Sequence, residues 1–154
     1  MRVLALSDQV LEHFYSPAVK ERFAEAELVV GCGDLPSYYL EYIVSMLNAP
    51  ILQVPGNHDP AAFPFADAED PAAQGARRQG WGNIDGRVVC ERGWLIAGLG
   101  GSVRYRPGAH QYSQAEMSRR VLRLAPRLFL NKARHGRYLD VLVTHAPPRG
   151  IHDA

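Results

Sequence analysis

The first third of the chain alternates between short apolar runs and segments of helical character. Three continuous apolar runs predict buried strands of a parallel sheet: residues 3–6, 28–32 and 51–54. Pro17 is placed to open a helix over residues 18–26, and Ser37 to cap a helix whose apolar stripe continues to Leu47. The order strand, helix, strand, helix, strand predicts an α/β fold with a mainly parallel sheet and right-handed crossovers.

Hydrophobic periodicity is lost over residues 60–86, where Ala, Pro, Gly and Asp dominate. A loop of this length inside one domain is usually functional or mobile. Its aromatic residues Phe63, Phe65 and Trp81 either pin the loop to the core, which we favour, or line a substrate pocket.

Two further strands, residues 87–90 and 94–99, are predicted on either side of a turn at residues 91–93, and a last strand covers residues 139–143. The glycines of residues 98–101 let the backbone turn sharply. Because no Lys followed by Ser or Thr completes them, we exclude a nucleotide P-loop here.

The longest helix is predicted from Ser113 to about Arg134, because Ser113 and Glu116 form a capping box. Pro126 is expected to kink this helix or to end its first segment. Six apolar residues at helical spacing are expected in the core: Met117, Val121, Leu124, Ala125, Leu128 and Phe129. The many arginines of this region form either a solvated face or a nucleic-acid patch, and the lack of interleaved aromatic side chains favours the solvated face.

Composition indicates one globular domain over residues 1–154, with 47% apolar and 21% charged residues. No apolar run approaches the roughly 20 residues that a membrane span needs, and no secretory signal follows Met1. Two cysteines are too few for a disulfide framework, so we expect reduced thiols in a cytoplasmic protein. For Cys32 we favour buried packing over redox chemistry.

Charge is divided unevenly although the net charge is only +1. Residues 1–75 contain 3 basic and 11 acidic side chains, whereas residues 76–154 contain 14 basic and 5 acidic ones. Bound cations would offset the acidic half, and the basic half could attract a phosphate-bearing substrate. The plainer alternative is that two solvated faces happen to segregate along the chain.

Four predicted strands are each followed directly by a side chain that can bind a metal. These side chains are Asp8, Asp34, Asn57 and His145. Because the carboxyl ends of strands in α/β sheets are where ligands bind, we expect the four to converge on one metal site. Carboxylate, amide and imidazole without a cysteine suit Mn, Fe, Zn or Mg better than a structural zinc.

Such a group could hold two cations, with Asp34 bridging them, Asp8 on one cation and Asn57 and His145 on the other. Two bridged metals can activate a water and stabilise phosphoryl oxygens during an in-line displacement. His58 could then protonate a departing alkoxide.

Other polar residues near these motifs have plainer interpretations. Asp59 could orient the His58 ring, and Arg149 either contacts phosphate or lies in solvent. Taken one at a time, the four candidate ligands would only cap turns or form loop hydrogen bonds. The remaining histidines are expected to be ordinary hydrogen-bonded histidines: His13, His110, His135 and His152.

These motifs resemble those of the calcineurin-like metallophosphoesterase superfamily. The matching segments are Ser7-Asp8, Gly33-Asp34, Gly56-Asn57-His58-Asp59 and Thr144-His145-Ala146-Pro147-Pro148. The resemblance implies a β-sandwich flanked by helices, and two metals with a bridging hydroxide. It places Asp8 and Asp34 on the first metal, and Asp34, Asn57 and His145 on the second. It also implies that His58 is the catalytic histidine of a hydrolase.

The sequence departs from the family pattern at two points. Gln9-Val10 follows Asp8 where the family has Asp-x-His, and the chain stops at Ala154 before a final Gly-His-x-His. We therefore expect a C-terminally truncated member with weak metal affinity and low turnover, tested best with added manganese.

The substrate stays open between phosphate monoesters and diesters, so the activity is that of a phosphatase or a phosphodiesterase. The alternative is a catalytically impaired scaffold or protein-binding module of the same fold. A nucleic-acid-binding protein is the least favoured of the three hypotheses.

Overall fold

Four parallel strands form the first of the two main sheets in the computed structural model, which describes residues 1–61 and 81–147. Their order follows the chain: β1 (Val3–Leu6), β2 (Leu28–Gly31), β3 (Ile51–Gln53) and β4 (Trp81–Asn83). The parallel pairing of β1, β2 and β3 confirms the prediction made from the apolar runs. The sequence does not predict β4, because its three residues form no apolar run. Phe63 and Phe65, expected to pin the preceding loop, lie outside the described residues.

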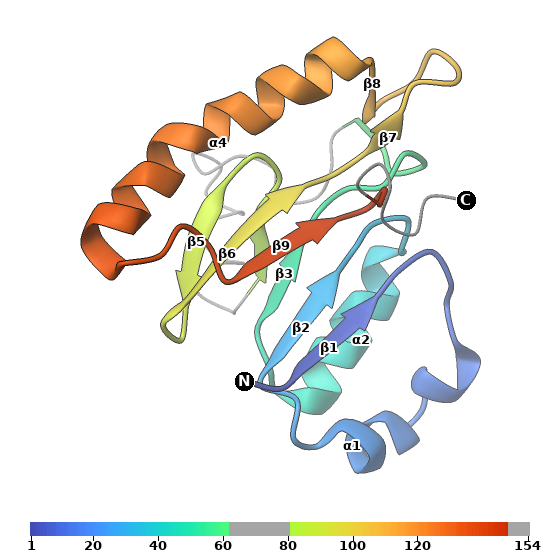
Figure 1. Cartoon of the computed structure of the whole chain (residues 1–154). Coiled ribbons are helices and arrows are strands. Elements are labelled where there is room, and N and C mark those ends of the chain that lie inside the picture. The colour runs from blue at the N-terminus through green and yellow to red at the C-terminus, as the bar shows by residue number, and fades with distance from the viewer. Residues whose placement is uncertain (62–80, 148–154) are drawn as a thin grey trace.

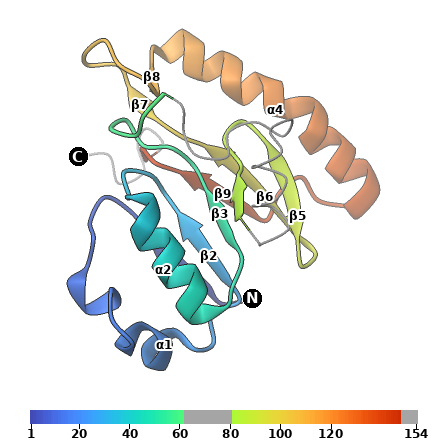
Figure 2. The same ribbon diagram turned by 180° about the vertical axis from the view of Figure 1, so that it is seen from behind.

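Two helices cover the outer face of this sheet, α1 (Ala18–Phe23) and α2 (Ser37–Leu47). Figure 2 shows α2 lying over one face of this sheet, in front of the strands. Val19 and Ile43 are fully buried between the helices and the sheet. The prediction that Ser37 caps α2 is wrong by one residue. Pro36 occupies the cap position, because its φ of −66° and ψ of 140° already give the extended backbone that a cap requires.

The second sheet contains β5 (Val88–Glu91), β6 (Trp94–Leu99) and β9 (Val141–Thr144). Strands β5 and β6 are antiparallel and joined by a tight turn, as the sequence predicts. Arg92 and Gly93 have φ values of 49° and 83° in this turn, which suits the twist of a hairpin. Strand β9 pairs with β6 in parallel, so its carboxyl end points the same way as that of β6.

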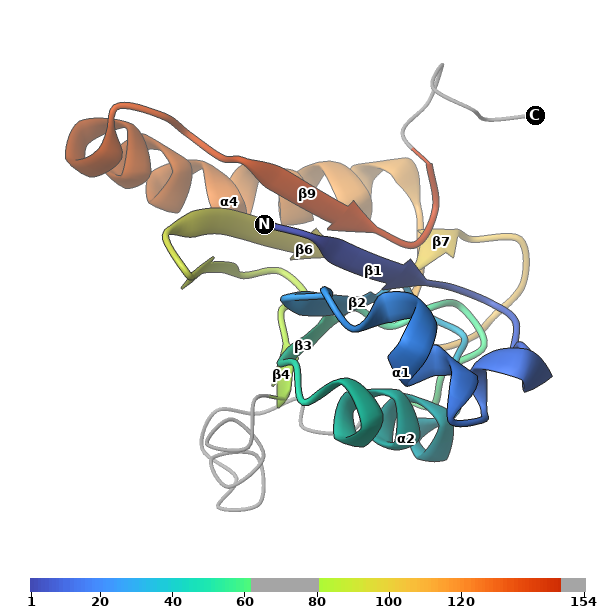
Figure 3. The same cartoon turned by 90° about the horizontal axis from the view of Figure 1, so that it is seen from below.

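Helix α4 (Gln114–His135) lies on the outer face of the second sheet (Figure 3). Its predicted capping box is confirmed, since the Ser113 side chain accepts from the Glu116 amide and Glu116 accepts from the Ser113 amide. The helix does not end at Pro126, which lies inside it. Of the six residues expected in the core, only Leu124 is buried, while Val121 and Phe129 are 49% and 64% exposed. The error arises because α4 rests on the sheet along one narrow stripe, so the sides of its apolar pattern face outward.

A short pair of parallel strands, β7 (Ser102–Val103) and β8 (Gln111–Tyr112), follows the second sheet and is not predicted from the sequence. Figures 1 and 3 show the whole arrangement as helices, sheet, sheet and helix. Three buried apolar clusters fill the spaces between these layers, and the central one joins Val30 and Leu52 to Ile96 and Val143. This is the predicted β-sandwich flanked by helices. No helix in the described residues has the length and apolarity that crossing a lipid bilayer requires.

Candidate metal centre

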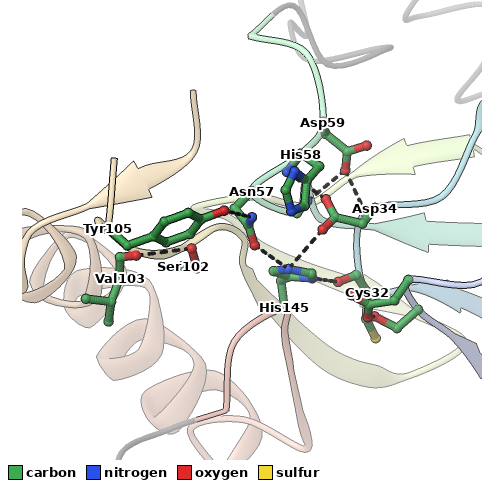
Figure 4. A network of polar contacts seen from close by, with 12 residues as sticks. Cys32, Asp34, Asn57, His58, Asp59, Ser102, Val103, Tyr105 and His145 are labelled. Atoms are coloured by element: carbon green, nitrogen blue, oxygen red, sulfur yellow. Dashed lines mark hydrogen bonds and ion pairs between the residues drawn. The ribbon is translucent and has the colours of Figure 1, made fainter. Parts of the chain in front are cut away.

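Loops from both sheets meet at one edge of the sandwich and bring the predicted ligands together (Figure 4). Asp8, Asp34 and His145 follow β1, β2 and β9, and one ligand atom of each lies within 4.8 Å of the others. The amide oxygen of Asn57, which follows β3, lies 3.0 Å from Nε2 of His145. The four side chains that the strand ends single out therefore share one small region of the structure.

The orientation of the His145 ring follows from its contacts. Its Nδ1 lies 2.8 Å from the backbone carbonyl oxygen of Cys32. A carbonyl oxygen only accepts hydrogen bonds, so Nδ1 carries a proton and donates it. In the neutral ring Nε2 is then an unprotonated ligand atom, held in place by a backbone contact on the opposite side.

Nε2 of His145 faces two oxygen atoms. Oδ1 of Asn57 lies at 3.0 Å and Oδ2 of Asp34 at 3.5 Å, and the Asp34 and His145 side chains are only 10% and 8% exposed. Three atoms with lone pairs therefore point toward one another, and two of them belong to side chains that water reaches little. A cation or a proton must lie among them, because acceptors facing acceptors repel.

Asn57 is turned so that its oxygen faces this group. Its Nδ2 donates a 2.9 Å hydrogen bond to the hydroxyl of Tyr105, which lies in the loop between β7 and β8. The amide can present only one of its two ends to the centre, and the tyrosine occupies the nitrogen. The remaining end is the oxygen, which is the atom that binds metals.

The backbone of the strand-end loops is held in a costly conformation. Asp8 and Asp34 both have left-handed backbones, with φ values of 61° and 59°. Such residues cost about 1–3 kcal/mol each and cluster at functional sites. The loops also touch closely, since a Cβ atom added to Gly56 would collide with Oδ1 of Asp34. Glycine at position 56 thus lets the β3 loop lie directly against the Asp34 carboxylate.

Asp59 stabilises this loop contact. Its Oδ2 accepts hydrogen bonds from the backbone amides of Asp34 and Gly56, at 3.0 and 2.7 Å. The expected contact with the His58 ring is not among its hydrogen bonds in the described structure. Asp59 ties the loops after β2 and β3 together, because one carboxylate oxygen takes both amides.

His58 is joined to the centre through its backbone and to a neighbouring arginine through its ring. Its amide donates to Oδ1 of Asp34 at 2.9 Å. Nη2 of Arg106 lies 3.3 Å from its Nδ1. A guanidinium only donates, so Nδ1 of His58 accepts and the proton of the neutral ring is on Nε2.

Asp8 lies at the more open side of the group. Its carboxylate accepts a hydrogen bond from the Ser7 hydroxyl, and its amide donates to the carbonyl of Gly33 at 3.1 Å. Burial raises the pKa of the neighbouring Cys32 thiol, and the charge of Asp8 raises it further. Cys32 is therefore a neutral thiol here, which agrees with a packing role.

Tyr105 and Arg106 are the contacts that sequence reasoning missed. They lie 48 positions from Asn57 and His58 and follow no strand end of the main sheets. The run Arg104-Tyr105-Arg106 between two glycines is the signal that could have drawn attention to them. Of the other candidates, His110 contacts the carbonyl of Pro60 at 3.0 Å, as expected for a loop histidine. Arg149 and His152 lie outside the described residues.

A model of the calcineurin-like phosphoesterase family matches residues 1–154. The chain belongs to the calcineurin-like phosphoesterase family. A similar solved structure is the crystal structure of TT1561 of Thermus thermophilus, with 16% sequence identity and a TM-score of 0.58. That likeness covers 81% of this phosphoesterase-family chain and 62% of the other, so the chain spans less than two thirds of its neighbour's length. The comparison with curated proteins gives no match.

The donor set suits the divalent metals that this phosphoesterase family binds. Asp8, Asp34 and His145 form a group that can hold a metal ion. It consists of carboxylate and imidazole, with an amide oxygen from Asn57 beside it and no thiolate. The converging lone pairs of these three donor atoms, on partly buried residues, are the observation that makes a cation fit.

Proposed function

We propose that the protein is a metal-dependent phosphoesterase that hydrolyses phosphate mono- or diesters. The observation that carries the proposal is the convergence of Nε2 of His145, Oδ1 of Asn57 and Oδ2 of Asp34, with Asp8 at their side. Family membership supplies the reaction class, and the geometry supplies a place where the required ion fits.

Asp8, Asp34, Asn57 and His145 would hold the divalent ions, which we take to be Mn, Fe, Zn or Mg from the mixture of oxygen and nitrogen donors. A bound divalent ion polarises phosphoryl oxygens and makes a hydroxide nucleophile available near neutral pH. Two ions would require Asp34 to be shared between them. Its Oδ2 faces His145, and its Oδ1 accepts from the His58 amide.

His58 is the residue we assign to the leaving group. With Nδ1 accepting from Arg106, the Nε2–H of the neutral ring is the end that can donate a proton to a departing oxygen. The bond from its amide to Asp34 keeps the ring beside the metal ligands. Asp59 is a positioning residue in this scheme, because it fixes the backbone on which both residues depend.

The test is hydrolysis of an aryl phosphate monoester and an aryl phosphate diester with added Mn²⁺, together with Mn²⁺ binding by calorimetry. Asp34→Asn and His145→Ala should each abolish turnover and strongly weaken Mn²⁺ binding. His135→Ala, at the exposed end of α4, is the matched control and should change neither. Turnover that survives both ligand substitutions would remove the proposed mechanism.

A scaffold without catalysis is the second candidate, and two observations favour it. Val10 stands where the family motif has a histidine, and Asp8, two positions before it, is exposed. Apolar side chains that line one hollow beside β7 and β9 are also exposed, with Val103 and Leu142 at 69% and 47%. A protein that takes up no Mn²⁺ and copurifies with a stoichiometric protein partner would support this candidate.

A further inference from the structure

The loop between β7 and β8 holds two side chains against the metal centre. Gln111, which is only 3% exposed, holds the backbone of this loop in place. Its Oε1 accepts from the amides of Tyr105 and Arg106 at 3.4 and 3.3 Å. Arg104 anchors the start of the loop, with Nη2 donating to Oε2 of Glu116 at 2.7 Å. The loop is therefore built into the fold at the start of α4.

Arg106 brings a positive charge to a region of carboxylates. Its Nη2 lies 3.3 Å from Nδ1 of His58, and its guanidinium carbon lies 5.4 Å from the Tyr105 ring centre. Neither of these contacts neutralises the charge, because His58 and Tyr105 contribute no carboxylate.

Several arginines of the described chain are paired with carboxylates, although exposed ones of α4 such as Arg123 are not. Arg104, Arg120 and Arg137 each form an ion pair, with Glu116, Asp85 and Asp140 respectively. Arg106 forms none with any carboxylate in residues 1–61 and 81–147, and it is exposed. Its guanidinium has five N–H donors, of which the histidine takes one, so the others are left for a ligand.

We propose that Arg106 binds the non-bridging oxygens of the substrate's phosphoryl group and makes phosphate monoesters the preferred substrate class. The inference rests on the proposed function. A monoester carries up to two negative charges on three non-bridging oxygens, and a diester carries one charge on two. A planar guanidinium matches such oxygens with two parallel hydrogen bonds, so it gains more from the monoester.

The position of Arg106 also fits the chemistry assigned to His58. The two side chains touch, so a phosphoryl group held by the guanidinium lies within reach of the imidazole. Asp8, Asp34 and Asp59 would otherwise repel the anion, and Arg106 offsets part of that charge. The alternative is that Arg106 only fixes the ring of His58, which would affect monoesters and diesters equally.

The test compares Arg106→Ala and Arg106→Lys with Arg123→Ala, an exposed arginine of α4 that serves as control. The first measurement is the affinity for inorganic phosphate, by calorimetry in the presence of Mn²⁺. Arg106→Ala should weaken phosphate binding about tenfold or more, because a charged hydrogen-bond donor is lost. The phosphate affinity of Arg106→Lys should lie between those of the wild type and Arg106→Ala, since lysine keeps the charge but not the planar guanidinium group. The control and all affinities for Mn²⁺ should stay unchanged.

The second measurement is kcat/KM for an aryl phosphate monoester and the matching diester. Arg106→Ala should lower the monoester value about tenfold or more and the diester value by less than about threefold. Equal losses on both esters, or unchanged phosphate affinity, overturn the role of Arg106 and leave the phosphoesterase proposal standing. A wild type that takes up no Mn²⁺ and hydrolyses neither ester overturns the phosphoesterase proposal, and a wild type that binds no phosphate overturns this inference.

Discussion

Two partly buried carboxylates, Asp34 and Asp85, lie in opposite electrostatic surroundings. Asp85 is 15% exposed and its Oδ1 accepts from Arg120 at 2.5 Å and from the amide of Gly100 at 2.7 Å. Asp34 is 10% exposed, and its Oδ2 faces the histidine nitrogen that also faces the Asn57 oxygen. The first carboxylate has its counter-charge within the protein, whereas the second has only a backbone amide on Oδ1 and faces other acceptors with Oδ2.

The surroundings of Asp85 show what a structural use of charge looks like in this fold. The Arg120 guanidinium lies over the Tyr112 ring, 4.2 Å from its centre, and also donates to the Tyr112 hydroxyl at 3.1 Å. Burial raises the pKa of Tyr112 above its ordinary value although the charge of Arg120 lowers it, so the hydroxyl stays neutral. Both terminal nitrogens of Arg120 meet acceptors here, although its buried Nε has no partner among the described residues, and the result is a link between α4, β8 and the segment after β4.

The contrast teaches how to separate a ligand site from a stabilising network. Asp8 and Asp34 have left-handed backbones, and Gly56 crowds the Asp34 carboxylate. Such strain is compensated when a ligand binds or by the rest of the fold. In Asp34 a carboxylate oxygen faces other acceptors, and the backbone that places it there is strained. This combination indicates a site for a cation.

The largest effect should follow from removing the charge of Asp34. Asp34→Asn should lower the affinity for Mn²⁺ at least about a hundredfold, because a charged ligand is replaced by a neutral one. Thermal unfolding without metal should stay unchanged or move to higher temperature, since an amide relieves the repulsion with Asn57 and His145. Calorimetric titration with Mn²⁺ and melting curves in chelator measure the two effects.

Asp85→Asn should give the reverse result. The free energy of unfolding should fall by about 2–3 kcal/mol, because the variant leaves the Arg120 charge without its partner in a place that is only 18% exposed. Affinity for Mn²⁺ should stay unchanged. Urea titration gives the first quantity and calorimetry the second. If Asp34→Asn destabilised the protein as much as Asp85→Asn, the two carboxylates would have the same structural role and the comparison would fail.

The same contrast explains how far the sequence could predict the site. The convergence of Asp8, Asp34, Asn57 and His145 can be predicted from the sequence. Each follows a strand, and the loops at the carboxyl ends of parallel strands lie at one edge of the sheet. The structure places these residues together, as expected. The contact of Tyr105 with Asn57 cannot be predicted from the sequence, because it depends on tertiary packing between segments 48 positions apart.

Errors in the predicted fold have a related origin. β4, β7 and β8 have only two or three residues each, too few for a periodic pattern. Val121 and Phe129 follow the helical period but lie outside the narrow stripe of α4 that touches the sheet. Periodicity identifies an apolar face, and only the neighbouring layer determines how much of that face is buried.

A smaller effect is expected from Tyr105→Phe, which tests whether the acceptor group depends on the tyrosine contact. Without the hydroxyl, the Asn57 amide can rotate and present its nitrogen to the centre. Affinity for Mn²⁺ should fall about tenfold, as for other residues that orient a metal ligand. Stability without metal should not change. Tyr138→Phe, at a half-exposed tyrosine beside Phe129, is the matched control for losing a hydroxyl. An unchanged affinity in Tyr105→Phe would mean that Asn57 needs no help to face the metal.

The smallest effect is expected from changing Glu116, whose carboxylate, like that of Asp85, is paired with donors of the protein. The Ser113 amide, then the Ser113 side chain and Arg104, lower the pKa of Glu116 from 4.5 to about 2. Because the folded pKa lies below the unfolded one, the charge stabilises the fold above pH 4.5, and this stabilisation is lost as the pH falls toward 2. Glu116→Gln should therefore melt below wild type at pH 6 and approach it as the solution is acidified, with Mn²⁺ affinity at pH 7 unchanged. A melting difference that is the same at every pH would show that Glu116 acts through its shape alone. Its charge would then contribute nothing to the stability of the start of α4.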